Sequence, residues 1–349
     1  MRPAKIPVTV LTGFLGAGKT TLLNRLLRAP GMAGTAVLIN EFGEIGLDHL
    51  LVERIDEDTV LLNAGCLCCT VRGDLVRALR DLAVRAEGGQ AVARVVIETT
   101  GLADPAPILQ TLMSDPVALS AFVLDGVVTL VDAATGAATL DTQVEAVKQA
   151  AMADRIVLTK TDIAEPSAVA ALDARVAALN PAAPRIRAVS GDLDPATVIG
   201  LGGHATAGRI PEVAAWLAAE AAAGGHHGHH HHHDVNRHDA RIHAFGLVFD
   251  DPLPWDGLAT WLEMLSVTRG TSLLRVKGLL NIAGEERPVA IHGVQHLFHP
   301  PARLAAWPED HDRRSRITFV LRDVPRAVVV EGLAAFLAAS RDQATPAKA

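Results

Sequence analysis

The chain has 349 residues, of which 49% are hydrophobic and 20% are charged, and its formal net charge is -7 at pH 7. This length suggests about two domains, and the apolar fraction is ample for packed cores. No uncharged apolar run is long enough to span a membrane and the basic residues do not cluster, so we expect neither a membrane nor a nucleic acid as partner.

A phosphate-binding loop is predicted close to the N-terminus. The strand pattern PVTVL at residues 7–11 leads into GFLGAGKT at residues 13–20, which matches GxxxxGK[ST] and is followed by leucines at helical spacing. Such a loop points backbone N–H groups at phosphate oxygens, while its lysine faces the β- and γ-phosphates and its threonine binds Mg²⁺. The predicted nucleotide contacts here are Gly13, Gly16, Ala17, Gly18, Lys19, Thr20 and Thr21.

Short strand patterns alternate with helical patterns from residue 6 to about residue 223. The strand patterns are PVTVL, TAVLIN, ARVVIE, VVTLVD, DRIVLT and PRIRAV. This alternation predicts an α/β domain over residues 1–223, built on a mostly parallel sheet. Because the first strand begins so early, no room remains for a signal peptide, and we expect a cytoplasmic protein.

Glu98 ends the strand pattern ARVVIE and is followed closely by Gly101. A carboxylate at such a strand end can hold the Mg²⁺ hydration shell, and a nearby glycine can bring its backbone N–H to the γ-phosphate. We therefore predict that Thr20 and Glu98 bind magnesium and that Gly101 contacts the nucleotide. The predicted catalytic residues are Lys19, Thr20 and Glu98. The alternative is that Glu98 only caps the helix that follows.

Guanine recognition is predicted directly after the strand pattern DRIVLT, where TKTD occupies residues 159–162. Asp162 can accept both ring N–H donors of guanine, whereas adenine would leave the carboxylate unpaired, and the Lys160 stem can cover the base plane. Ser190, after the strand pattern PRIRAV, either closes the same pocket or belongs to a plain turn. The predicted substrate is GTP rather than ATP, and the predicted fold is a P-loop GTPase domain.

The three cysteines, Cys66, Cys68 and Cys69, fall within four positions, a clustering typical of metal ligands and not of a disulfide framework. They lie between the phosphate loop and Glu98, in the interval where GTPases respond to the γ-phosphate. Three thiolates favour zinc or another soft or borderline metal and leave one tetrahedral position for Glu44, water or a client ligand. The alternative is that they are buried residues or redox thiols.

The composition changes at residue 224 to a histidine-rich segment without apolar surface, which predicts a flexible linker over residues 224–240. Histidine tracts bind metals weakly and often without a defined geometry. The predicted auxiliary metal ligands are His229, His230 and His231. Further strand and helix patterns predict a smaller α+β C-terminal domain over residues 241–340, followed by a disordered tail at residues 341–349.

Several longer motifs occur in order along the chain: GFLGAGKTT, NEFGEIGLD, GCLCC, IETTGLADPAPI, DGVVTLVDA, TKTD, SLLRVKGLL and HGVQHLF. Together they resemble, nearly from end to end, the CobW family of P-loop GTPases and in particular its YjiA-like branch of zinc- or cobalt-binding proteins. The resemblance implies slow Mg²⁺-dependent GTP hydrolysis, a metal site on the CxCC motif with help from neighbouring acids, and delivery of metal to clients.

Position by position, the resemblance implies that residues 13–21 bind the phosphates and that Thr20 and Glu98 bind magnesium. It also implies that Lys160 and Asp162 recognise the base and that Cys66, Cys68 and Cys69 bind the metal. Two positions depart from the family pattern. Thr159 replaces an asparagine that is common in guanine-recognition motifs, and Ile39 stands where some relatives have an acid.

The expected function is thus a GTP-hydrolysing metallochaperone that uses GTP, Mg²⁺ and Zn²⁺ or Co²⁺, releases GDP, and has a client metalloprotein as partner. One alternative is a nonenzymatic zinc or cobalt buffer that binds metal through the histidine segment. A second alternative is a GTPase that delivers metal for cobalamin synthesis or to a nitrile hydratase centre. The oligomeric state stays open, with a homodimer as one alternative.

Overall fold

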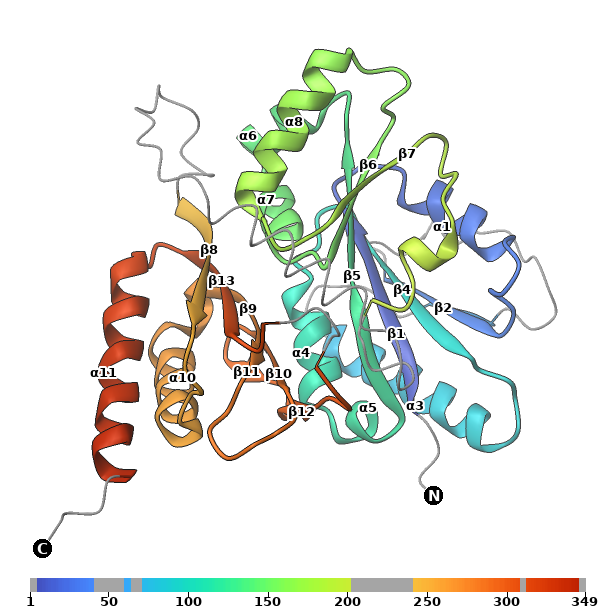
Figure 1. The fold of residues 1–349 in the computed structure, drawn as a ribbon. Helices are drawn as coiled ribbons and strands as arrows, with labels where there is room; N and C mark the ends of the chain where they lie inside the picture. The colour runs from blue at the N-terminus through green and yellow to red at the C-terminus, as the bar shows by residue number, and fades with distance from the viewer. Residues whose placement is uncertain (1–4, 41–59, 64–70, 202–240, 308–311, 345–349) are drawn as a thin grey trace, which may run out of the picture.

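The structure, a computed structural model, describes residues 5–40, 60–63, 71–201, 241–307 and 312–344. Within this part of the chain, two domains lie side by side, each built around its own β-sheet (Figure 1). The expected P-loop type α/β domain and smaller α+β domain are therefore confirmed. No helix in the described ranges is long and apolar enough to cross a membrane.

The first domain contains a parallel sheet in the order β3-β2-β4-β1-β5-β6-β7, with seven strands among the described residues. The strands are β1 (Ile6–Gly13), β2 (Thr35–Asn40), β3 (Val60–Asn63), β4 (Arg94–Thr99), β5 (Phe122–Asp132), β6 (Arg155–Thr159) and β7 (Arg185–Ala188). All except β3 correspond to the predicted strand patterns. The edge strand β3, of 4 residues, was missed, and its parallel pairing with β2 places it in the sheet.

Helices cover both faces of this sheet. On one face, α1 (Lys19–Leu27) buries Leu22 and Leu23 against Val37 and Val128 of the strands. The opposite face is covered by α3 (Val71–Glu87), α4 (Ala106–Ser114), α5 (Pro116–Ala121), α6 (Gly136–Thr142), α7 (Val144–Ala151) and α8 (Pro166–Leu179). Burial on both faces explains why the strands read as continuous β-branched runs and not as alternating patterns.

The second domain is an antiparallel sheet in the order β11-β10-β9-β13-β8, with β12 paired to β10. Its elements are β8 (Ile242–Phe249), α10 (Trp255–Arg269), β9 (Leu273–Leu280), β10 (Val289–Val294), β11 (Leu297–Phe298), β12 (Ala302–Arg303), β13 (Ser315–Arg322) and α11 (Arg326–Ala344). Trp261 of α10 packs edge-on against Phe319 of β13, with ring centroids 5.9 Å apart. This contact joins the helical layer to the sheet.

Of the two predicted boundaries of the second domain, one differs from the structure and the other lies outside the described residues. The last helix continues to Ala344, so residues 341–344, which were predicted as part of a disordered tail, are helical. The prediction failed there because Arg341, Gln343 and Ala344 are ordinary helix formers that extend α11 without a break. The predicted linker at residues 224–240 lies outside the described residues.

The second domain shares its core with the first. Leu274, Val294 and Val320 of the C-terminal sheet belong to the same buried cluster as the residues of α4 and α7. The side chain of Gln110 on α4 also donates to Gln295, with Nε2 and Oε1 2.6 Å apart. The sheet of the second domain is therefore packed against helices of the first domain, and the two domains dock through apolar and polar contacts.

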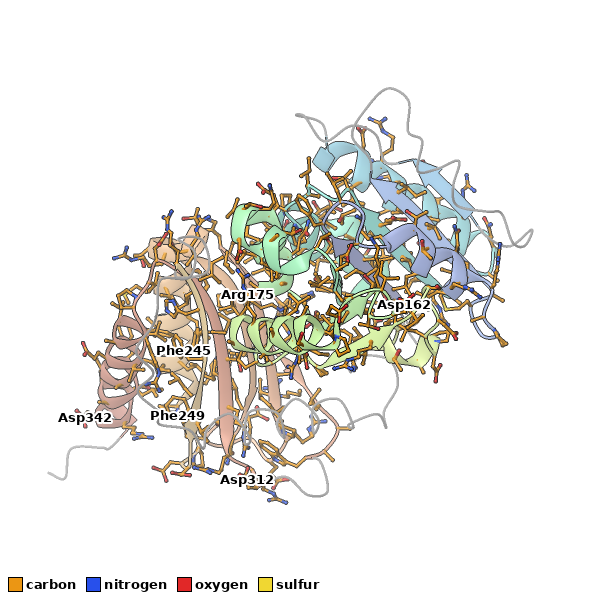
Figure 2. All side chains as sticks on the ribbon, turned by 90° about the horizontal axis from the view of Figure 1, so that it is seen from above. Asp162, Arg175, Phe245, Phe249, Asp312 and Asp342 are labelled. Atoms are coloured by element: carbon orange, nitrogen blue, oxygen red, sulfur yellow. The ribbon has the colours of Figure 1, made fainter. Side chains whose placement is uncertain are left out.

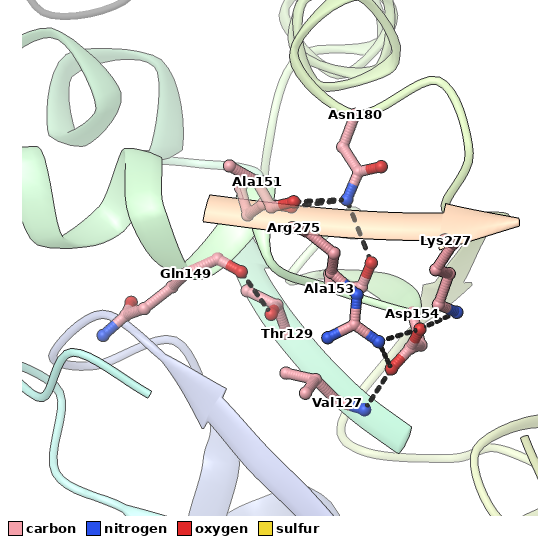
Figure 3. A network of polar contacts seen from close by, with 10 residues as sticks. Val127, Thr129, Gln149, Ala151, Ala153, Asp154, Asn180, Arg275 and Lys277 are labelled. Carbon is pink, nitrogen blue, oxygen red and sulfur yellow. Dashed lines mark hydrogen bonds and ion pairs between the residues drawn. The ribbon is translucent and has the colours of Figure 1, made fainter. Parts of the chain in front are cut away.

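A buried ion cluster lies at this interface (Figure 3). Asp154, just before β6, accepts from Arg275 of β9 at 2.6 Å to each carboxylate oxygen and also pairs with Lys277 of β9. The side chains of Arg275 and Asp154 are only 6% and 5% exposed. Burial by itself raises the pKa of Asp154, but Arg275 and Lys277 outweigh it and hold the pKa well below its ordinary value.

Replacing Asp154 with asparagine should destabilise the protein by about 3–5 kcal/mol, because two cations would remain buried without their anion. The measurement is urea unfolding of wild type and Asp154→Asn. Because the folded-state pKa of Asp154 is lowered, its contribution is complete above about pH 5 and is lost as the pH falls below that value. The difference between the two proteins should therefore shrink on acidification.

The matched control for this prediction is Asp250→Asn. Asp250 also pairs with an arginine of the second domain, Arg314, but its side chain is 77% exposed. Exposed ion pairs contribute little to stability, so this variant should unfold like the wild type. Equal stability of Asp154→Asn and Asp250→Asn would show that the buried cluster does not stabilise the docked domains.

Candidate nucleotide site

The phosphate loop connects β1 to α1 at the carboxyl edge of the parallel sheet. Gly16 and Gly18 have φ angles of 74° and 93°, in the left-handed region that favours glycine. A Cβ on Gly13 would lie 2.5 Å from the carbonyl oxygen of Leu130 on β5. The glycines predicted from the motif are therefore required by the backbone path, and the N-terminus of α1 opens toward the place where phosphates would lie.

Lys19 is the first residue of α1 and folds back over the loop. Its Nζ donates to the carbonyl oxygen of Gly13 at 2.9 Å and to that of Phe14 at 3.3 Å. The residue as a whole is 8% exposed. A cation held above the loop in this way is placed to meet the β- and γ-phosphates of a nucleotide.

Thr20 and Glu98 come together as the sequence predicted. The Thr20 hydroxyl donates to Glu98 Oε1 at 2.9 Å, and Glu98 is 2% exposed at the end of β4, directly beside β1. A hydroxyl and a carboxylate at the mouth of a phosphate loop are the hard oxygen donors that Mg²⁺ prefers. The residues present therefore fit a magnesium ion, with Glu98 acting directly or through water.

Gly101 follows Glu98 and lies against the phosphate loop. A Cβ on Gly101 would be 2.5 Å from the backbone nitrogen and 2.7 Å from the Cα atom of Leu15. Real Cβ atoms do not approach backbone this closely, so only glycine fits here. Gly101 thus lies against the phosphate loop, and its contact with the γ-phosphate stays a prediction.

The predicted guanine-recognition residues lie at the ends of β6 and β7. Thr159 ends β6, and its hydroxyl donates to the carbonyl oxygen of Ala17 at 2.8 Å, which ties this loop to the phosphate loop. Asp162 is exposed (Figure 2), so its carboxylate is accessible to the ring N–H groups of a base. Ser190 is also exposed and precedes Gly191, whose Cβ would lie 3.1 Å from Thr21 O.

Asp132, the last residue of β5, belongs to this site although the sequence analysis did not select it. Its Oδ2 accepts from Lys160 Nζ at 2.6 Å, and its Oδ1 accepts from the backbone nitrogen of Ala134 at 2.8 Å. Lys160 is thereby held by an anchored carboxylate while its side chain stays 39% exposed. The available signal was the acid at the end of the predicted strand VVTLVD.

The predicted metal ligands lie outside the part of the chain that the structure describes. Cys66, Cys68, Cys69 and Glu44 lie outside the described residues, as do the three auxiliary histidines His229, His230 and His231. Within the described ranges there is no group of three or more His, Cys, Asp or Glu side chains that could hold a metal ion. The cysteine site therefore stays a prediction.

The Thr159 hydroxyl can be tested by Thr159→Val, which keeps the shape and removes the donor to Ala17. We expect Kd for GTP and GDP to rise together by about fivefold, since a hydrogen bond of this kind contributes about 1 kcal/mol. Fluorescence titration with labelled nucleotides measures both constants. Thr161→Val, in the same loop, is the control and should bind normally. Unchanged affinity in Thr159→Val would mean that the hydroxyl does not organise the base loop.

Known proteins resemble this chain in sequence and in fold. A protein of Escherichia coli (strain K12) named zinc chaperone YjiA is 36% identical over 295 residues, which cover 84% of this chain and 87% of that protein. A Schizosaccharomyces pombe protein named zinc-regulated GTPase metalloprotein activator 1 is 37% identical over 196 residues, 54% of this chain and 47% of that protein. The crystal structure of Zn(II)-bound YjiA GTPase from E. coli matches with a TM-score of 0.67 and 29% identity, covering 96% of this chain and 99% of that chain.

Two family models match the chain, one in each domain. The CobW/HypB/UreG nucleotide-binding domain matches residues 7–187, and the cobalamin synthesis protein cobW C-terminal domain matches residues 242–337. The first match contains the phosphate loop, Glu98 and the TKTD segment. Sequence, fold and site geometry thus agree with the resemblance inferred from the motifs, and the chain belongs to the CobW/HypB/UreG family of nucleotide-binding proteins, with a CobW-type C-terminal domain.

Proposed function

We propose that this protein is a GTP-hydrolysing metallochaperone that binds zinc or cobalt at Cys66, Cys68 and Cys69 and delivers it to client metalloproteins. The observation that carries the proposal is the link between Thr159 and Ala17, 2.8 Å long, which joins a guanine-recognition segment to a phosphate loop at one edge of the sheet. The names of the relatives, zinc chaperone and zinc-regulated GTPase metalloprotein activator, support zinc as the metal and a metalloprotein as the client.

The position of the cysteine segment in the sheet order supports a coupled nucleotide and metal site. β2 pairs in parallel with β4, and β3 pairs in parallel with β2, so the chain leaves Asn40 and Asn63 at the same carboxyl edge as Glu98. The segment with Glu44 follows Asn40, and the cysteine motif follows Asn63. Parallel strands direct consecutive loops to one edge, which favours metal ligands close to the nucleotide.

The expected chemistry is attack of water on the γ-phosphorus of GTP, with cleavage of the bond to the bridging oxygen and release of GDP and phosphate. Lys19 would exchange its bonds to the Gly13 and Phe14 carbonyls for phosphate oxygens. Mg²⁺ held at Thr20 and Glu98 would supply positive charge against the developing negative charge. Lys160 and Asp162 would fix the base, and Gly101 would offer its backbone N–H to the γ-phosphate.

Energetics constrain how the metal leaves. Coupling between two sites is typically about 1–3 kcal/mol, whereas structural zinc sites hold their metal by about 10–16 kcal/mol. GTP hydrolysis therefore cannot by itself expel zinc into water. We infer transfer by ligand exchange, in which thiolates or imidazoles of the client enter as Cys66, Cys68 and Cys69 leave one after another.

Zinc affinity should depend on the bound nucleotide. In protein lacking residues 224–233, chelator competition should give zinc dissociation constants that differ by about fivefold or more between GDP and a nonhydrolysable GTP analogue, which corresponds to about 1 kcal/mol of coupling. The triple variant with serine at positions 66, 68 and 69 is the control and should show no difference. Equal constants for the two nucleotides in the parent protein would contradict the coupling.

The competing function is a nonenzymatic metal buffer that uses the histidine segment. Lys19→Ala separates the two functions, because it removes the cation of the phosphate loop and leaves every candidate metal ligand in place. For a chaperone we expect loss of GTP hydrolysis and failure to restore growth of a deletion strain under zinc limitation. A buffer would restore growth as well as the wild type does, and that outcome would refute the chaperone.

A further inference from the structure

A buried glutamine on α7 holds the segment that carries Gly101. The Gln149 side chain has 0% exposure, and its Nε2 donates to the carbonyl oxygens of Gly101 at 3.1 Å and Ala103 at 2.9 Å. Both partners are acceptors, so the amide NH₂ and not the amide oxygen must face them. Gln149 is therefore a two-donor clamp on the turn that follows Glu98.

The clamp sets how closely Gly101 approaches the phosphate loop. Gln149 lines one cavity together with Phe14 and Leu15 of that loop. Leu15 is also the residue that a Cβ on Gly101 would meet at 2.5 Å. Gly101 is thus confined between Leu15 and Gln149, with its carbonyl oxygen bonded to the clamp and its N–H belonging to the same short turn.

The support behind the clamp is itself fixed, as Figure 3 shows. The backbone carbonyl of Gln149 accepts from the Thr129 hydroxyl of β5 at 2.7 Å. The residues that follow are held by Asn180, whose Nδ2 donates to the carbonyl oxygens of Ala150, Ala151 and Ala153 at 2.9, 3.1 and 3.0 Å. Because α7 is tied to the sheet and to the end of α8, Gln149 presents its donors from a rigid position.

The chemistry of position 149 favours a role beyond filling space. The Gln149 Oε1 atom is buried and has no hydrogen-bond partner among the described residues, and a buried polar atom without a partner destabilises a protein. A methionine would fill a similar volume without that cost. The amide is useful at this position only for its two N–H donors, and both of them act on the Gly101 to Ala103 turn.

We propose that Gln149 is a positioning residue for the γ-phosphate: it fixes the Gly101 turn so that the Gly101 N–H meets GTP, and it does not contact the nucleotide itself. The inference rests on the proposed GTPase function. GDP has no γ-phosphate and makes no use of Gly101. Loss of the clamp should therefore weaken binding of GTP and its hydrolysis while leaving binding of GDP intact.

The test compares Gln149→Met, which removes both donors, with Gln149→Glu, which places a carboxylate against two carbonyl oxygens. The matched control is Gln143→Glu, the same chemical change at the N-cap of α7, where the Gln143 side chain donates to the Thr142 hydroxyl. For each protein, Kd is measured for GDP and for a nonhydrolysable GTP analogue, together with kcat and KM for GTP and the urea unfolding curve.

Gln149→Met should raise Kd for the GTP analogue by about tenfold, as expected for loss of interactions of about 1.4 kcal/mol. Kd for GDP should change less than about twofold, which is under 0.5 kcal/mol. The kcat of Gln149→Met should also be lower than that of the wild type. Gln149→Glu should lose as much affinity for the GTP analogue or more, and Gln143→Glu should keep the wild-type values. Equal losses for GDP and the analogue, or no loss, would make Gln149 a structural residue only. A wild type that binds neither nucleotide would instead refute the proposed function.

Discussion

Parallel pairing of the strands in the first domain is the constraint on which the site depends. In the order β4-β1-β5-β6-β7, each strand delivers its following loop to the same edge. Glu98, the phosphate loop, Asp132, Thr159 and Ser190 come from five different places in the chain, yet all of them lie at or just after strand ends on this edge. The sheet thus assembles a site that no single segment contains.

Cross-links between neighbouring loops then fix the geometry of this edge. Thr20 bonds to Glu98, Thr159 to Ala17, and Lys160 to Asp132. Each bond by itself contributes modestly to stability, but together they connect the loops after four strands. A site with preorganised donors loses less entropy when it binds a ligand. The Thr159 bond also shows that the threonine at this position links its loop to the phosphate loop.

The second domain packs on the helices that support this edge. α4 begins just after the Glu98 to Asp104 turn and contacts Gln295 through Gln110. α7 carries Gln149. Asp154 follows the C-terminal end of α7 after a short turn and is paired with Arg275 and Lys277. The C-terminal domain therefore contacts the elements that hold the Gly101 turn.

The sequence by itself determined those features of the protein that depend on consecutive residues. The phosphate loop, the strand before it and the helix after it follow from the consecutive residues between Ile6 and Leu27. The strands β2, β4, β5, β6 and β7 could be recognised because both faces of the sheet are buried. The pairing of Thr20 with Glu98 was predicted because a phosphate loop needs a carboxylate nearby.

Only the tertiary structure decided which distant side chains meet. Nothing local marks Asp154 as the partner of Arg275, 121 positions away, or Asp132 as the partner of Lys160. Gln149 reads as one more residue of an amphipathic helix until its Nε2 is seen on two carbonyl oxygens. The short β3 was missed for a related reason, because it is stabilised by pairing with β2, which lies elsewhere in the chain.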